Sequence, residues 1–128
     1  MRFRVDVTEA RAALQGVVRL RLEPGHDLDI HVADLDTGSA FAVTGPSDDI
    51  PAALLQNADL VSVIDVAGGR NVARRLQGTL RFDGWDHPDT LEVVVSPTFA
   101  RWLIGMPVLC KFHLLLPRQE MVTADEAL

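Results

Sequence analysis

Apolar and polar residues alternate in this chain over short runs, and Pro or Gly interrupts the runs every few residues. Residues 18–22 and 28–32 alternate on either side of Pro24-Gly25, and residues 72–82 alternate after Gly68-Gly69. Alternation with a period of two buries one face of a strand, and such Pro and Gly pairs turn the chain between strands. The sequence therefore predicts a mainly β protein built from short strands and hairpins.

Helices are expected to be few and short. One is predicted from Thr8 as N-cap to Gly16, and another begins between Ser47 and Pro51 and ends near Asn57. The remaining expected strands cover residues 3–7, 40–44, 60–66, 91–95 and a long apolar run at 108–116, which Pro117 ends.

The length of the chain suits one domain. Its 128 residues are 48% apolar, enough to fill a single core but not two lobes. We expect residues 1–16 to form an N-terminal extension and residues 17–117 to form the domain. Residues 118–128 are polar and acidic without packing periodicity, and they are expected to be a mobile tail unless a partner holds them.

Composition excludes several classes of function. The net charge is −6 and no block of Lys and Arg is present, which argues against a nucleic-acid partner. No apolar run is long enough to span a membrane, and residues 1–4 lead into alternation instead of a signal peptide. A cytoplasmic protein is therefore predicted. Cys110, the only cysteine, is expected to be a packed thiol.

Two short motifs carry the chemistry. Asp36-Thr37-Gly38-Ser39 directly follows an alternating run, and Leu103-Ile104-Gly105 lies near the C-terminus. Cleaving a peptide with carboxylates alone requires two of them that share one proton. A chain with one such motif must supply the second carboxylate from another copy across a two-fold axis. The simpler alternative is that Asp36 to Gly38 form only a hairpin turn.

From Val17 to Leu116 the chain resembles the retropepsin-like aspartic proteases, which include retroviral proteases and small bacterial relatives. The matching pieces occur in the same order as in that family, and they are a strand pair, the Asp36 motif, the stretch Ile50–Leu55, a glycine-tipped hairpin and the segment Trp102–Leu109. The resemblance implies a closed β-barrel or β-sandwich protomer with one or two short helices, active as a homodimer.

The resemblance also implies a role for each residue of the first motif. Asp36 is the catalytic carboxylate, and Thr37 bonds across to the partner's loop. Gly38 lets backbone approach the carboxylates, and Ser39 hydrogen-bonds the outer oxygen of Asp36. No metal or cofactor is required.

The other implied elements surround this loop. Leu103-Ile104-Gly105 is the turn behind the site, where any Cβ on Gly105 would collide with the loop. Ala67, Gly68, Gly69 and Arg70 form the tip of a flap that folds over an extended peptide substrate. The substrate would lie as an added strand, with apolar side chains around the scissile bond.

Two features leave alternatives open. Asp34 occupies a position that is usually apolar in the family, and in an extended strand it shares a face with Asp36 and adds negative potential. This charge would either raise the apparent pKa of the carboxylate pair or mark a site that no longer cuts. Asp27, Asp29 and His31 could hold a metal, although a solvated strand face is favoured. The functional alternatives are a catalytically silent binding or assembly module of the same fold, and an unrelated acidic α+β interaction domain.

Overall fold

The computed structural model describes residues 1–64 and 68–126. Within them the chain forms thirteen strands, two short α-helices and two 3-10 helices. The helices are η1 (Ser47–Asp49), α1 (Ala52–Gln56), α2 (Met106–Leu109) and η2 (Leu116–Arg118). The strands are β1 (Arg2–Val7), β2 (Ala12–Leu14), β3 (Val18–Leu22), β4 (His26–Ile30), β5 (Ala33–Leu35), β6 (Val43–Pro46), β7 (Asp59–Ile64), β8 (Arg70–Phe82), β9 (Trp85–Asp86), β10 (Leu91–Ser96), β11 (Trp102–Ile104), β12 (Phe112–Leu115) and β13 (Glu120–Thr123).

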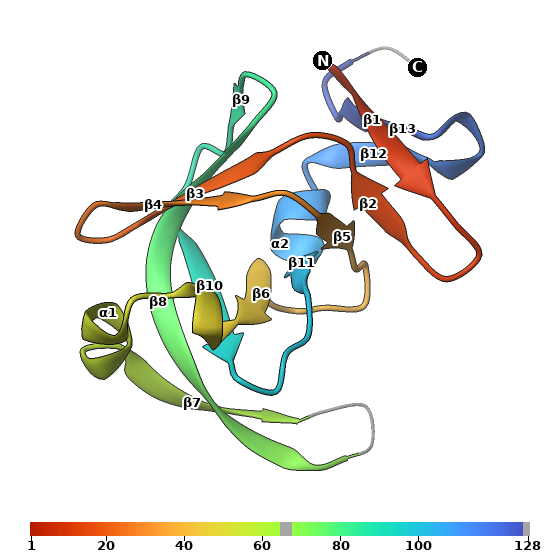
Figure 1. The fold of residues 1–128 in the computed structure, drawn as a ribbon. Coiled ribbons are helices and arrows are strands. Elements are labelled where there is room, and N and C mark those ends of the chain that lie inside the picture. The colour runs from red at the N-terminus through yellow and green to blue at the C-terminus, as the bar shows by residue number, and fades with distance from the viewer. Residues whose placement is uncertain (65–67, 127–128) are drawn as a thin grey trace.

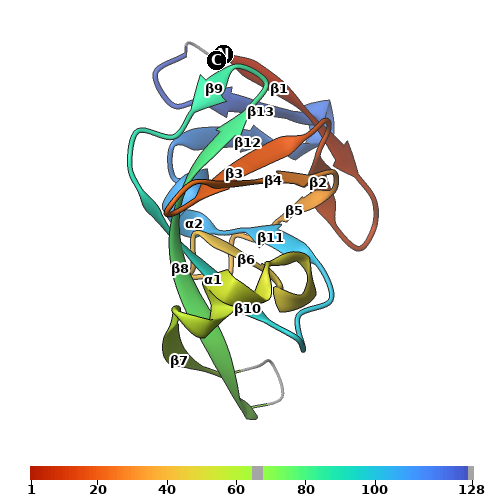
Figure 2. The ribbon, with the colours of Figure 1, turned by 60° about the vertical axis from the view of Figure 1, so that its left-hand side comes forward.

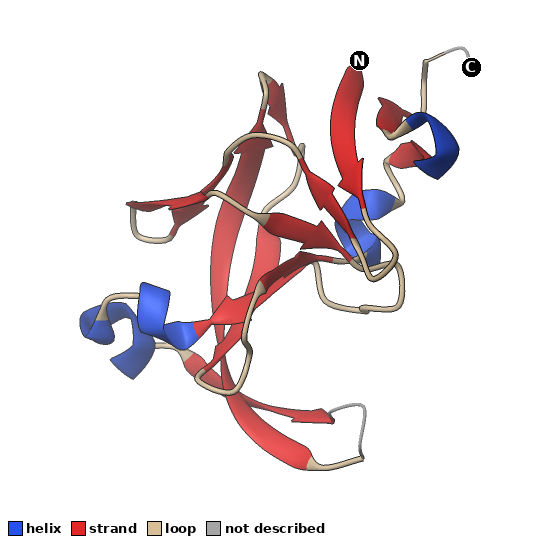
Figure 3. Cartoon of the chain, turned by 45° about the vertical axis from the view of Figure 1, so that its right-hand side comes forward, coloured by secondary structure: helices blue, strands red, loops and turns tan. Residues whose placement is uncertain are grey.

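The strands join into one strongly curled sheet with the order β12-β13-β1-β2-β5-β11-β6-β10-β8-β3-β4, and β7 and β9 pair with β8 beside this path. Figures 1 and 2 show β1, β12 and β13 gathered at one end and the β7–β8 hairpin projecting at the other. The few helical segments are short and lie between strands (Figure 3). The predicted mainly β class with one or two short α-helices is confirmed.

The long strand β8 organises the core. Its alternating residues Leu76, Leu80 and Phe82 are buried while Gln77, Thr79 and Arg81 face solvent, as the period of two predicts. β8 pairs with β10 on one side and with β3 on the other, so its apolar face meets theirs inside the curl. Fully buried side chains from these and neighbouring strands include Leu20, Leu22, Leu80, Val93, Val95 and Ile104.

The hairpins follow the sequence prediction closely. β3 and β4 pair in antiparallel register around Pro24-Gly25, with Leu20 opposite Leu28. β7 and β8 pair from Asp59 opposite Arg75 to Ile64 opposite Arg70. Helix α1 falls within the short helical segment expected before Asn57. Turn residues and alternation were sufficient to predict these elements because both signals are local.

Two expectations for the ends of the chain are wrong. The segment after Thr8 contains strand β2 instead of a helix, and β2 pairs with β1 and β5. The expected mobile tail contains β13, whose Met121 and Val122 are fully buried between β1 and β12. A strand of four residues inserted between two others gains burial from both neighbours, so its own sequence needs no long apolar pattern.

The apolar run at 108–116 was expected to be one strand, and this is also wrong. Residues 106–109 form helix α2, with Pro107 in its first turn, and only Phe112–Leu115 form a strand. Proline at the start of a helix lacks only a hydrogen bond that is unused there, and an apolar run alone does not separate helix from strand. Cys110 consequently follows the helix and is exposed, contrary to the expected packed thiol.

None of the helices in the described part of the chain has the length and hydropathy needed to span a bilayer.

The terminal strand should contribute measurably to stability. Met121→Ala is expected to lower the free energy of unfolding by about 2–4 kcal/mol, because the change leaves a cavity where a fully buried side chain packs. Met106→Ala is the matched control, because Met106 is 41% exposed, and its effect should stay below about 1 kcal/mol. Urea denaturation followed by circular dichroism measures both. Equal effects would show that β13 is not part of the folded core.

Candidate active site

Strand β5 positions Asp36, and two neighbours hold β5 in place. β5 pairs with β2 in antiparallel register and with β11 in parallel register. The backbone N–H of Asp36 donates to the carbonyl of Ile104 at 2.8 Å, so the β5–β11 ladder continues to this residue. The sequence predicted that the strand starting at Leu28 runs straight into the motif. The structure ends β4 at Ile30 and changes pairing partners before β5 begins.

The Asp36 motif forms a tight turn closed on its own carboxylate. Gly38 N–H donates to Asp36 Oδ1 at 2.9 Å, and Ser39 N–H donates to the Asp36 carbonyl at 3.2 Å. A Cβ on Gly38 would stand 3.3 Å from Asp36 Oδ1, tighter than an ordinary contact. Asp36 is half-buried, whereas Thr37 and Gly38 are exposed at the tip of the turn. The carboxylate is thus oriented by backbone and remains open on one side.

The Ser39 hydroxyl is used differently from the implied role. Its Oγ accepts a hydrogen bond from Phe41 N–H and donates one to the Phe41 carbonyl, both at 3.3 Å. In the single chain this hydroxyl therefore braces the segment after the turn and does not bond the Asp36 carboxylate.

The Leu103-Ile104-Gly105 segment lies directly behind the turn. Gly105 N–H donates to the Ala42 carbonyl at 2.9 Å, and Met106 N–H donates to the Ser39 carbonyl at 3.0 Å. A Cβ on Gly105 would overlap the Phe41 carbonyl oxygen and would stand 2.9 Å from the Ser39 carbonyl oxygen. The structure thus brings the two sequence motifs into contact, and only glycine fits at this crossing.

Asp34 lies on β5 and is almost completely buried. Its carboxylate forms ion pairs with Arg101 Nη1 at 3.2 Å and Arg11 Nη1 at 3.6 Å. Among the described residues neither carboxylate oxygen has a hydrogen-bond partner. The sequence predicted that Asp34 adds negative potential beside Asp36. Instead two guanidinium groups face one carboxylate, so the three groups together carry a net charge of +1.

Sequence reasoning missed both arginines. Arg11 lies in the segment predicted to be helical, and Arg101 lies in the loop before β11. The usable signal was Asp34 itself, since a charge predicted to lie inside a sheet requires a counter-ion.

The predicted flap residues lie at the end of the β7–β8 hairpin. Gly68, Gly69 and Arg70 are exposed, and Gly68 has a positive φ of 82° with open space around it. Ala67 lies outside the described residues. One face of the hairpin carries Leu60, Ile64 and Val72, each more than 60% exposed. Their register partners on that face are Arg74, Arg70 and Ser62. Figure 1 shows the hairpin extending away from the rest of the sheet.

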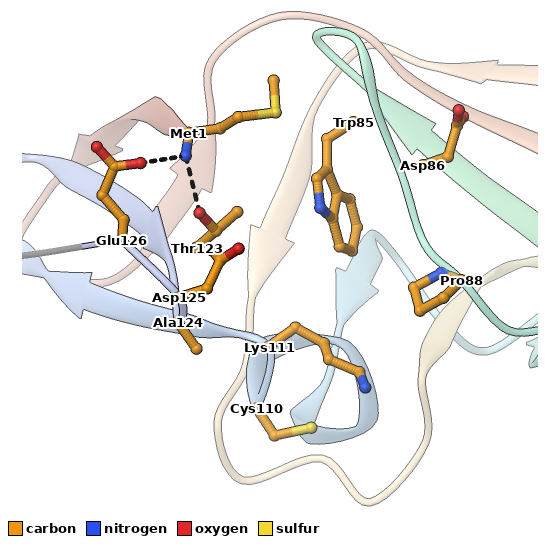
Figure 4. Close-up of a pocket in the computed structure, with 10 residues that line it drawn as sticks. All are labelled: Met1, Trp85, Asp86, Pro88, Cys110, Lys111, Thr123, Ala124, Asp125 and Glu126. Carbon is orange, nitrogen blue, oxygen red and sulfur yellow. Dashed lines mark hydrogen bonds and ion pairs between the residues drawn. The ribbon is translucent and has the colours of Figure 1, made fainter.

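A pocket of about 580 Å³ lies beside the chain termini (Figure 4). None of its lining residues belongs to the Asp36 motif or to the turn behind it. The Met1 ammonium group donates to Glu126 Oε2 at 2.6 Å and to Thr123 Oγ1 at 2.8 Å. The hydrogen bond from the ammonium group to Glu126 holds the pKa of that carboxyl below its usual range. Glu126 therefore serves as counter-ion to the amino group, and the pocket is separate from the candidate site at Asp36.

The alternative metal site on β4 has other partners. Arg19 donates to Asp29 at 2.9 Å and holds the pKa of that carboxyl below its usual range, and Arg21 lies 3.8 Å from Asp27. The part of the chain that the structure describes contains no group of three or more His, Cys, Asp or Glu side chains suited to a metal.

Comparison with solved structures identifies the fold. The crystal structure of a retropepsin-like aspartic protease from Rickettsia conorii superimposes with a TM-score of 0.62 at 12% identity, covering 96% of this chain and 88% of that one. The solution structure of the Simian Foamy Virus (mac) protease gives a TM-score of 0.43 at 16% identity, covering 77% of this chain and 99% of that one. The sequence matches no protein-family model and no curated protein. The chain therefore has a retropepsin-like fold.

Proposed function

We propose that the chain is one protomer of a homodimeric aspartic endopeptidase. The observation that carries this proposal is the Asp36 turn packed against Gly105. The backbone N–H of Gly38 orients the Asp36 carboxylate, and the segment behind the turn admits no side chain at Gly105. The retropepsin-like fold of the chain, and the similarity of its structure to that of an aspartic protease, support the same proposal.

The chemistry requires a second copy. A chain that presents one such carboxylate must meet the Asp36 of its partner across a two-fold axis, with Thr37 at the contact between the two turns. Exposure of Thr37 and Gly38 in the single chain leaves this surface open for a partner. Two carboxylates held close repel each other when both are ionised, so the pair retains one shared proton.

In this mechanism the ionised carboxylate polarises a bound water as general base, and the protonated one hydrogen-bonds the scissile carbonyl as general acid. The water attacks that carbonyl and gives a tetrahedral diol without a covalent enzyme intermediate. The substrate lies extended between Asp36 and the β7–β8 hairpin, whose exposed Leu60, Ile64 and Val72 side chains would cover it and exclude water. Residues 36 and 68–70 thus act from opposite sides of the peptide.

One observation favours a second candidate, a catalytically silent module of the same fold. Asp34 places a charged cluster on the strand that carries Asp36. In that case the chain would bind extended peptides without cutting them.

Peptide digestion separates the two candidates. The wild-type chain is incubated with casein and with a peptide mixture over a series of pH values from acidic to neutral, and products are identified by mass spectrometry. We expect internal cleavage that is fastest at mildly acidic pH and falls toward neutral pH, because the pair must retain one proton. Peptide binding without cleavage at every pH would support the silent module.

A further inference from the structure

The arginines around Asp34 have unused binding capacity. The Asp34 side chain is 3% exposed, but those of Arg11 and Arg101 are 43% and 56% exposed. Each arginine reaches the same oxygen, Asp34 Oδ2, and neither contact is a well-formed hydrogen bond. A guanidinium group has five N–H donors in a fixed fork. Most of these donors therefore remain available to a carboxylate that approaches from solvent.

This cluster lies on the catalytic face of the sheet. Because the Asp36 N–H continues the β5–β11 ladder, the strand stays extended through Asp36. Side chains two residues apart on a strand point to the same face, so Asp34 and Asp36 share one face. Two residues of strand rise about 7 Å, which places the arginine cluster beside the catalytic carboxylate.

A small pocket opens on the same face. Leu103 is the register partner of Asp34 on one side and of Thr44 on the other, and paired residues of neighbouring strands share a face. Leu103, Thr44, Phe99 and Arg101 are among the residues that line this pocket, which has a volume of about 240 Å³. It therefore combines apolar walls with one cationic side chain.

We propose that Arg101, assisted by Arg11, binds an acidic side chain of the substrate next to the scissile bond. The methylene groups of a Glu side chain would pack on Leu103 and Phe99, and its carboxylate would accept hydrogen bonds from the guanidinium fork. Asp34 acts as an internal counter-ion that keeps both arginines in position and competes with the substrate carboxylate. This inference rests on the proposed peptidase function.

Matched peptides test the preference. A cleaved peptide from the digest is synthesised with Glu or Gln at each position flanking the scissile bond, and kcat/KM is measured for each. Wild type is expected to prefer Glu to Gln by about tenfold or more at one position, since a hydrogen bond to a charged group is stronger than one to a neutral group. Equal rates at every position would overturn the inference, although cleavage itself would uphold the peptidase.

Three variants assign the preference to the cluster. Arg101→Gln should bring the Glu/Gln ratio close to one, and Arg11→Gln should lower it. Asp34→Asn should raise the ratio, because the arginines lose their internal competitor. Arg81→Gln, which alters an exposed arginine on β8 paired with Asp86, should leave the ratio as in wild type.

A purely structural ion-pair cluster predicts a different pattern. Arg101→Gln and Asp34→Asn would then lower kcat/KM for both peptides by the same factor and leave the ratio unchanged, which would overturn the inference. Melting temperatures of all variants identify any that fail to fold, and Arg11→Gln supplies the test if Arg101→Gln is one of them. A chain that cleaves no peptide at all would overturn the inference together with the proposed function.

Discussion

Replacing Asp36 with asparagine is expected to abolish peptide hydrolysis while leaving the chain folded. An amide cannot accept the proton of the attacking water, so the general base and the shared proton are both lost. General acid and base groups contribute about a hundredfold to ten-thousandfold each, and kcat should fall by about a thousandfold or more. The variant is measured on a peptide that the wild type cleaves, at the optimal pH of the wild type.

Folding of this variant should change little. Asp36 is half-buried, and an asparagine oxygen can still accept the bond from Gly38 N–H, so the free energy of unfolding should stay within about 1 kcal/mol of wild type. Asp48→Asn, at an exposed position, is the matched control and should retain full activity. Cleavage by Asp36→Asn at the wild-type rate would remove Asp36 from the mechanism.

Gly105→Ala should cause the largest loss of stability among the substitutions considered. The added methyl group would overlap the Phe41 carbonyl oxygen, which accepts a hydrogen bond from the Ser39 hydroxyl. It would also crowd the Ser39 carbonyl oxygen, which accepts the Met106 N–H and so joins the two motifs. A collision with backbone cannot be relieved by a rotamer change, so we expect the free energy of unfolding to fall by about 3–5 kcal/mol. Urea denaturation measures the loss.

Gly84→Ala separates collision from backbone strain. Gly84 has a positive φ of 78° but no neighbour within 4 Å of an added Cβ, so its replacement carries only the conformational cost of about 1–2 kcal/mol. A Gly105→Ala chain as stable as Gly84→Ala would show that the segment behind the Asp36 turn is packed loosely. The support that we infer for the carboxylate would then be lost.

Local sequence signals predicted the elements that depend on neighbouring residues. Alternation identified the buried and exposed faces of β8 from Leu76 to Phe82, although Val72 is exposed and Ala73 is buried. Pro24-Gly25 located the β3–β4 turn. The signals failed at two places for different reasons. β13 is a strand because β1 and β12 enclose it, and β1 is distant in sequence. Residues 106–109 are helical although their apolar run resembles a buried strand, because such a run alone does not separate the two.

The site was predicted to a similar extent. The two motifs pointed to a turn and a glycine behind it, and the structure brings Asp36 and Gly105 to that arrangement, although the roles of these residues stay predictions. The sign of the charge near Asp36 was not predictable. It depends on Arg11 and Arg101, which pairing with β5 brings together from opposite ends of the chain.

The most direct test of the paired-carboxylate account is a subunit-mixing assay. Equal amounts of wild-type and Asp36→Asn chains are unfolded together in urea, refolded together and assayed at fixed total concentration. If each active site needs two Asp36 carboxylates, only dimers of two wild-type chains cut, and activity falls to about a quarter of that of pure wild type. An activity of about half, as expected when each chain acts alone, would contradict the account.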